Sequence, residues 1–242
     1  MKIGFFGDSW IAFKPSHLIK FPDTEWAWPN QVGNNFKGEH LYTSRGGTHL
    51  FYAYQQLKKE IDNVDYVILS VSDYERVPNE YGIDTMCPCE YGKNHVESIF
   101  GDLEGRTSQE FITYIKTHCK YYPTQMSYAA QKGLLLEIDE LLGKKNKKAL
   151  IIPGFEESFV GYTFKNAAFL DCSFHEIKME DKRKEIPPKK LKQMFEDRTL
   201  VALNHFLKQE ADIIAGAITE LIKQEYSPGK KEFKKYFDYL FN

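Results

Sequence analysis

The sequence predicts an α/β fold in which a mostly parallel, five-stranded sheet lies between two layers of helices. Short apolar segments alternate along the chain with longer segments whose apolar residues recur at helical spacing. In the strongest apolar segment, Val67, Ile68 and Leu69 leave no polar face, which is typical of a strand buried on both sides. Strands that alternate with helices are joined by right-handed crossovers, so we expect a parallel sheet.

The predicted strands are short, and each ends close to a glycine, a proline or a polar residue. They are Lys2 to Phe6, His40 to Ser44, Val64 to Val71, Ala149 to Pro153 and Ala167 to Leu170. Ligands of parallel sheets bind at the carboxyl ends of the strands. We therefore expect the functional residues in the loops that follow the first three strands.

Helical spacing of apolar residues predicts helices at about 28–36, 49–61, 108–119, 126–142 and 211–222. Pro29 suits the first turn of the first helix, where its missing N–H costs no hydrogen bond. Thr48 is suited to cap the second helix.

The chain is expected to form one main domain over residues 1–226, because 242 residues suit a single α/β domain with insertions. An insertion at 78–124 follows the third strand. Its glycines, prolines and aromatic residues suit a lid or cleft wall that overhangs Ser9. Residues 227–242 are expected to form an amphipathic tail helix, which either docks on the domain or binds a protein partner.

Charge and hydropathy exclude several classes of partner. The net charge of -2 predicts neither a nucleic acid nor an anionic membrane as the partner. No segment approaches the length of an apolar membrane span. The apolar run at the start ends at Gly7, which leaves no signal-peptide core, so we expect a cytoplasmic protein; a virion component would have the same features.

The tripeptide Gly7-Asp8-Ser9 follows the first predicted strand directly. A glycine permits a sharp turn at the end of a buried strand, and such a turn lifts a serine hydroxyl out of the sheet. Backbone N–H groups at such a turn can hold an oxyanion. The position of Ser9 therefore predicts a nucleophile for acyl transfer.

The arrangement of four short blocks resembles the SGNH (GDSL-type) hydrolases. Gly7-Asp8-Ser9 follows the first strand, Gly46 and Gly47 the second, and Ser72-Asp73 the third, while Asn204-His205 precedes the last helix. The resemblance covers about residues 1–225. It implies a flavodoxin-like three-layer α/β/α fold, and esterase, lipase or carbohydrate-deacetylase chemistry that needs neither a metal nor another cofactor.

The resemblance also implies a role for each block. Ser9 is the nucleophile and His205 takes its proton. The oxyanion hole consists of the Ser9 N–H, the N–H of Gly46 or Gly47, and the side chain of Ser72. The form of the last two blocks looks especially like the SGNH proteins carried by tailed phages, which have a polar-acidic pair followed by an arginine, here Arg76.

Two positions depart from the family pattern. Ser72 stands where the family has an asparagine, and its hydroxyl has a shorter reach. Ala202 stands where the family has the aspartate that orients the histidine. Asp197 is our first candidate for that role, and the alternatives are Asp8, Asp73 and Asp171. The alternatives to His205 are His17, His49 and His175, of which His49 could line the site without being the base.

The cysteines and histidines of the insertion have the right chemistry for zinc, but their spacing fits no standard finger. They are Cys87, Cys89, His95, His118 and Cys119. We expect no metal site there. No glycine-rich loop of the phosphate-binding type is present in the sequence.

The sequence therefore supports two functional interpretations. The first is a serine hydrolase that acts on an ester, such as an O-acetyl group on a glycan. The second is a module of the same fold that has lost activity and binds a glycan or a protein, for example on a phage particle. Ala202 and Ser72 favour the second, whereas Ser9 and His205 favour the first.

Overall fold

The computed structural model describes residues 1–12, 27–44, 48–74, 76, 117, 124–177, 206 and 208–237. These residues form an open sheet of six strands in the order β2-β1-β3-β4-β5-β6, and every neighbouring pair is parallel. The strands are β1 (Ile3–Phe6), β2 (Leu41–Tyr42), β3 (Tyr66–Val71), β4 (Lys148–Pro153), β5 (Ala168–Leu170) and β6 (Gly229–Lys231). The predicted α/β class and parallel sheet are confirmed, with one strand more than the five predicted.

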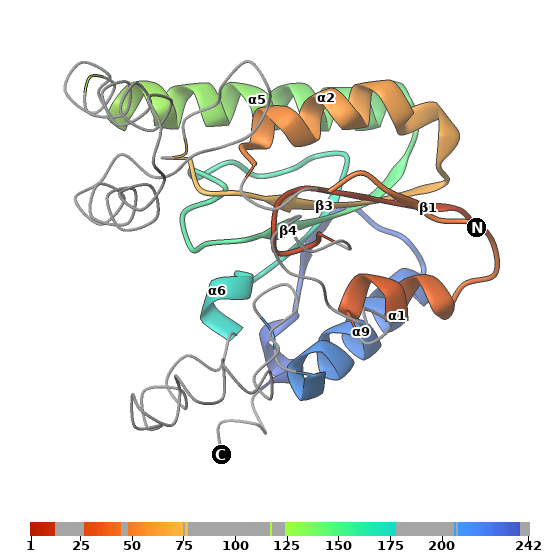
Figure 1. Ribbon diagram of the computed structural model, residues 1–242. Helices are drawn as coiled ribbons and strands as arrows, with labels where there is room; N and C mark the ends of the chain where they lie inside the picture. Colours follow the sequence, from red (N-terminus) through yellow and green to blue (C-terminus); the bar gives the residue numbers. More distant parts are fainter. Residues whose placement is uncertain are drawn as a thin grey trace, which may run out of the picture.

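Helices cover both faces of the sheet (Figure 1). One layer contains α2 (Leu50–Glu60), which continues into the 3-10 turn η1 (Ile61–Asn63), and α5 (Thr124–Lys144). The other contains α1 (Trp28–Asn34) and α9 (Lys208–Lys223), which pack against each other. The short helix α6 (Phe174–Ile177) follows β5, and the 3-10 turn η2 (Lys234–Tyr236) follows β6.

Side chains of the central strands alternate between two hydrophobic cores, because successive residues of a strand point to opposite faces. In β3, Tyr66 and Ile68 belong to the core beneath α1 and α9. Val67, Leu69 and Val71 belong to the core beneath α2 and α5. A strand that must be apolar on both faces explains the continuous apolar run in the sequence.

The N-cap of α2 differs from the prediction. His49 occupies the cap position, in an extended conformation, and its Nδ1 accepts a hydrogen bond of 3.0 Å from the N–H of Phe51. Thr48, the predicted cap, instead donates its hydroxyl to the carbonyl oxygen of Gly7 at 3.4 Å. Thr48 therefore joins its own loop to the loop after β1, and the imidazole of His49 caps α2.

The prediction of a tail helix at 227–242 is corrected by the structure. Gly229 has a φ of +107° and opens β6, which pairs with β5 and supplies the sixth strand. Phe233 and Phe237 are fully buried in the core beneath α9, and only the short turn η2 lies between them. A spacing of four residues between aromatic side chains is also the spacing of a helix face, which is why the sequence indicated a helix.

The carboxylate of Asp171 fixes this segment after β6. Its Oδ1 accepts the N–H groups of Phe233 at 2.7 Å and Lys234 at 3.1 Å. Asp171 was one of the alternatives for orienting the catalytic histidine, and the structure gives it this local role. In the described ranges, no helix is both long enough and apolar enough to cross a membrane.

Candidate functional site

The order of the strands places the candidate site between β1 and β3. From β1 the chain moves outward to β2, whereas from β3 it moves in the opposite direction to β4. The loops after β1 and β3 therefore diverge at this point, which is where open parallel sheets bind their ligands. Gly7-Asp8-Ser9 follows β1, and Ser72-Asp73 follows β3.

A glycine is required where β1 ends. Gly7 has a φ of +139°, and a Cβ at this position would lie 2.8 Å from the carbonyl oxygen of Ser70 on β3. The chain then turns: the N–H of Trp10 donates to Asp8 Oδ1 at 3.2 Å, and the N–H of Ile11 donates to the Asp8 carbonyl oxygen at 3.2 Å. Ser9 lies in this turn and is partly exposed, as a nucleophile must be.

Asp8 anchors the turn from inside. The residue is 1 % exposed, and its Oδ1 also accepts the hydroxyl of Ser70 at 3.2 Å. Its Oδ2 lies 3.3 Å from Nη1 of Arg76. Burial raises the pKa of the Asp8 carboxyl above its ordinary value, while Arg76 and the hydrogen bonds act in the opposite direction. These contacts engage both carboxylate oxygens in holding the loop that carries Ser9.

Arg76 joins three loops at the carboxyl edge of the sheet. Besides Asp8, its Nη1 donates to the carbonyl oxygen of Thr48 at 2.8 Å, and its guanidinium carbon lies 5.7 Å from the centre of the Phe155 ring. The side chain is only 15 % exposed. In the sequence Arg76 was noted only as part of a family-like pattern, and nothing there identified Asp8 as its partner.

The residues on either side of the second block contact the loop of the first block. The hydroxyl of Ser44 donates to the carbonyl oxygen of Ile11 at 2.9 Å, and Thr48 donates to Gly7 from the other side. Gly46 and Gly47 themselves lie outside the described residues. His49, directly after this block, is 6 % exposed, and burial together with the charge of Arg76 lowers its pKa to about 4.

Ser72, the predicted oxyanion donor of the third block, is 1 % exposed, and its hydroxyl has no hydrogen-bond partner among the described residues. Its carbonyl oxygen accepts the side-chain amide of Gln131 at 2.9 Å. The same amide donates to the carbonyl oxygen of Ser158 at 2.7 Å. Gln131 is buried on α5 and links the loops after β3 and β4, a role that the sequence did not reveal.

A cavity of about 200 Å³ lies over the ends of β3, β4 and β5. It is lined by Asp73, Tyr74, Phe155, Glu156, Glu157, Ser158 and His175. Nδ1 of His175 lies 3.4 Å from Glu156 Oε1. The ring of Phe155 contacts both the His175 ring, at 5.7 Å, and the Trp10 ring, at 5.6 Å. The cavity is therefore a neighbour of the turn that carries Ser9.

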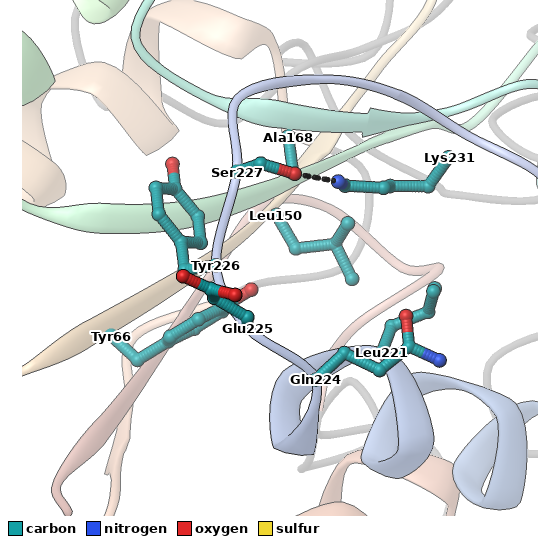
Figure 2. A pocket seen from close by; sticks show the side chains of 9 residues that line it. All are labelled: Tyr66, Leu150, Ala168, Leu221, Gln224, Glu225, Tyr226, Ser227 and Lys231. Atoms are coloured by element: carbon teal, nitrogen blue, oxygen red, sulfur yellow. Dashed lines mark hydrogen bonds between the residues drawn. The ribbon is translucent and has the colours of Figure 1, made fainter.

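At the opposite edge of the sheet, a small cavity of about 10 Å³ lies near the first residues of β3 and β5, Tyr66 and Ala168 (Figure 2). Lys231 donates to the hydroxyl of Ser227 at 2.7 Å on its rim. Such a volume holds at most about one water molecule. Of these two cavities, the one at the carboxyl edge has the larger space for a substrate.

His205 and Asp197 lie outside the described residues, as do His17, the cysteines of the insertion and the predicted lid at 78–124, except for Thr117 and Thr124. The residue after His205 is described: Phe206 is fully buried, and its ring lies 5.5 Å from that of Trp10 and 5.2 Å from that of Phe174. Among the residues that the structure describes, no group of three or more His, Cys, Asp or Glu side chains could hold a metal ion.

No family model matches the chain, and no curated protein matches it. Among solved structures, the chain is similar to a protein from Desulfitobacterium hafniense DCB-2 that has been assigned to the lipolytic G-D-S-L family, with 11% sequence identity and a TM-score of 0.43. The match covers 90% of this chain and 98% of that chain. The fold class itself rests on the strand order and the parallel pairing described above.

Proposed function

We propose that this protein is a serine hydrolase that cleaves an ester, such as an O-acetyl group on a glycan. Ser9 is the nucleophile, and His205 is the general base. Asp197 is the candidate for orienting the imidazole. The Ser9 N–H and the N–H of Gly46 or Gly47 hold the oxyanion, with Ser72 as the third predicted donor.

The observation that carries this proposal is the contact between the rings of Trp10 and Phe206, at 5.5 Å. Trp10 directly follows Ser9, and Phe206 directly follows His205. The residues that directly follow the proposed nucleophile and the proposed base therefore pack in the same core. The contact supports a Ser–His pair formed from the two ends of the chain.

The reaction follows from these roles. As the Ser9 oxygen bonds to the carbonyl carbon of the ester, its proton passes to a ring nitrogen of His205. The tetrahedral oxyanion then collapses, and the departing alcohol takes the proton from the imidazolium. Water attacks the acyl-enzyme in the same way and releases the acid. Hydrogen-bond donors placed at the developing negative charge lower the barriers to formation and to hydrolysis of the acyl-enzyme.

The test is hydrolysis of p-nitrophenyl acetate and of an O-acetylated glycan. Ser9→Ala should lower kcat by a factor of about 10³ or more without a change in the melting temperature, because Ser9 is partly exposed. Ser227→Ala, at the opposite edge of the sheet, is the matched control and should keep full activity. Equal turnover by wild type and Ser9→Ala would refute the assignment of the nucleophile.

The second candidate function is a binding module without activity. Ala202, in place of the family's aspartate, and the buried hydroxyl of Ser72 favour it. Saturable binding of a glycan by folded wild-type protein that hydrolyses no ester would support this candidate over the first.

A further inference from the structure

The hydrogen bonding of His49 fixes which of its nitrogens carries the proton. Its Nδ1 accepts the N–H of Phe51 at 3.0 Å, so Nδ1 holds no proton. Burial, and then the charge of Arg76, lower the pKa of this imidazole to about 4. The side chain is therefore neutral at physiological pH, and its single ring proton is on Nε2.

This Nε2–H has no acceptor among the described residues, although His49 is only 6 % exposed. The residue lies almost wholly inside the protein, so this proton is left for water or a bound molecule to accept. Ser72 differs in one respect. Its hydroxyl is one of the fully buried side-chain atoms that have no partner in the described part of the chain. Nε2 of His49 is not one of these atoms and is therefore not fully buried as the Ser72 hydroxyl is.

The position of His49 places this donor at the candidate site. His49 stands two residues after Gly47 of the second block, and its neighbour Thr48 donates to Gly7 at the start of the Ser9 turn. Arg76, which binds the Thr48 carbonyl oxygen, also binds Asp8 of the same turn. His49 is also the N-cap of α2, whose N-terminus has the positive end of a helix dipole at this edge of the sheet.

We propose that His49 is a further catalytic residue, whose Nε2–H donates a hydrogen bond to the oxyanion that forms when Ser9 attacks the ester. The inference rests on the proposed function, which supplies Ser9 as the nucleophile. It adds an imidazole N–H to the backbone N–H groups of Ser9 and of Gly46 or Gly47 as a donor to this oxyanion.

The chemistry needs no extra proton. The proton of Ser9 goes to His205, and His49 keeps its own throughout, because it only donates a hydrogen bond. With its Nδ1 accepting the Phe51 N–H and its pKa lowered to about 4, the His49 ring is poorly suited to act as the general base. A neutral imidazole whose pKa is lowered by its surroundings acts as such an electrophile in another well-known enzyme, triosephosphate isomerase.

His49→Ser is the variant that separates catalysis from helix capping. Serine is a favoured N-cap and keeps an acceptor for the Phe51 N–H, but it removes the Nε2–H. We expect kcat for p-nitrophenyl acetate to fall by about 10²- to 10³-fold with little change in KM, as for loss of one oxyanion donor. The rate at which a fluorophosphonate labels Ser9 should fall as well. His49→Ala, which removes both donor and cap, shows the cost of the cap by its lower melting temperature.

A measurement without substrate tests whether the His49 ring is neutral with its proton on Nε2. The ring ¹⁵N shifts of His49 should report a neutral imidazole with its proton on Nε2 at pH 6. A proton on Nδ1, or unchanged kcat and labelling rate in folded His49→Ser, would overturn the inference while leaving the hydrolase proposal intact. Wild-type protein with neither turnover nor a Ser9 adduct would instead overturn the hydrolase proposal, and the inference with it.

Discussion

The buried imidazole of His49 makes the stability of the protein depend on pH in a defined window. Its pKa is about 4 in the folded protein and 6.5 when unperturbed. Between these values the unfolded chain binds a proton that the folded chain does not, so the free energy of unfolding falls as the pH falls. The stabilisation is complete above pH 6.5, decreases through the window and is gone below pH 4.

The size of the effect follows from the shift. A change from 6.5 to about 4 corresponds to about 3 kcal/mol between the two limits. At pH 5 the loss relative to pH 8 is about 2 kcal/mol. His49→Ser removes the titrating group and retains a cap, so the stability of wild type relative to the variant should fall by these amounts as the pH falls.

Urea unfolding of both proteins from pH 8 to pH 4.5 measures the difference directly. Asp8, whose raised pKa acts in the opposite direction, is present in both proteins and cancels in the comparison. A stability difference that stays constant from pH 8 to pH 4.5 would show that His49 is not a buried neutral imidazole, and would refute the reasoning.

Three further predictions concern the residues that hold the site and the sheet. Arg76→Leu should lower the free energy of unfolding by about 3 to 5 kcal/mol at pH 8, because it leaves the Asp8 carboxylate buried without its cation. This loss should be smaller at pH 5, where the Asp8 carboxyl binds a proton more readily. Gly154→Ala should lower the free energy of unfolding in urea by about 1 to 3 kcal/mol, since its Cβ would lie 2.8 Å from the carbonyl oxygen of Val71. Gly216→Ala is the control and should not destabilise the protein, because a Cβ at this position of α9 has open space around it. Phe237→Ala should cost about 3 to 5 kcal/mol in the same assay, and a cost near zero would show that the segment after β6 is not part of the core.

The elements of the sheet were predictable because their signals are local. The apolar run before Gly7 and the one that ends at Val71 became β1 and β3. Their neighbouring polar residues were correctly expected at strand ends, since parallel strands bring their carboxyl ends to one edge. The sixth strand was not predictable in this way, because a three-residue edge strand such as Gly229–Lys231 carries almost no apolar pattern.

The contacts that shape the site depend on residues far apart in the sequence. Nothing near Asp8 indicates that Arg76 neutralises it, and nothing near Gln131 indicates that its amide joins two loops. The role of His49 illustrates the same limit. Its place after the second block suggested that it lines the site, but its tautomer is set by the Phe51 N–H and its neutrality by burial and Arg76, which only the fold determines.

The central claim is that Ser9 is an activated nucleophile, and covalent labelling tests it most directly. Folded wild-type protein is incubated with a fluorophosphonate, and the modified residue is located by mass spectrometry of the peptides. The account predicts a single adduct on Ser9, formed in proportion to the loss of esterase activity and absent from Ser9→Ala. No adduct on folded protein, or an adduct on another serine, would contradict it.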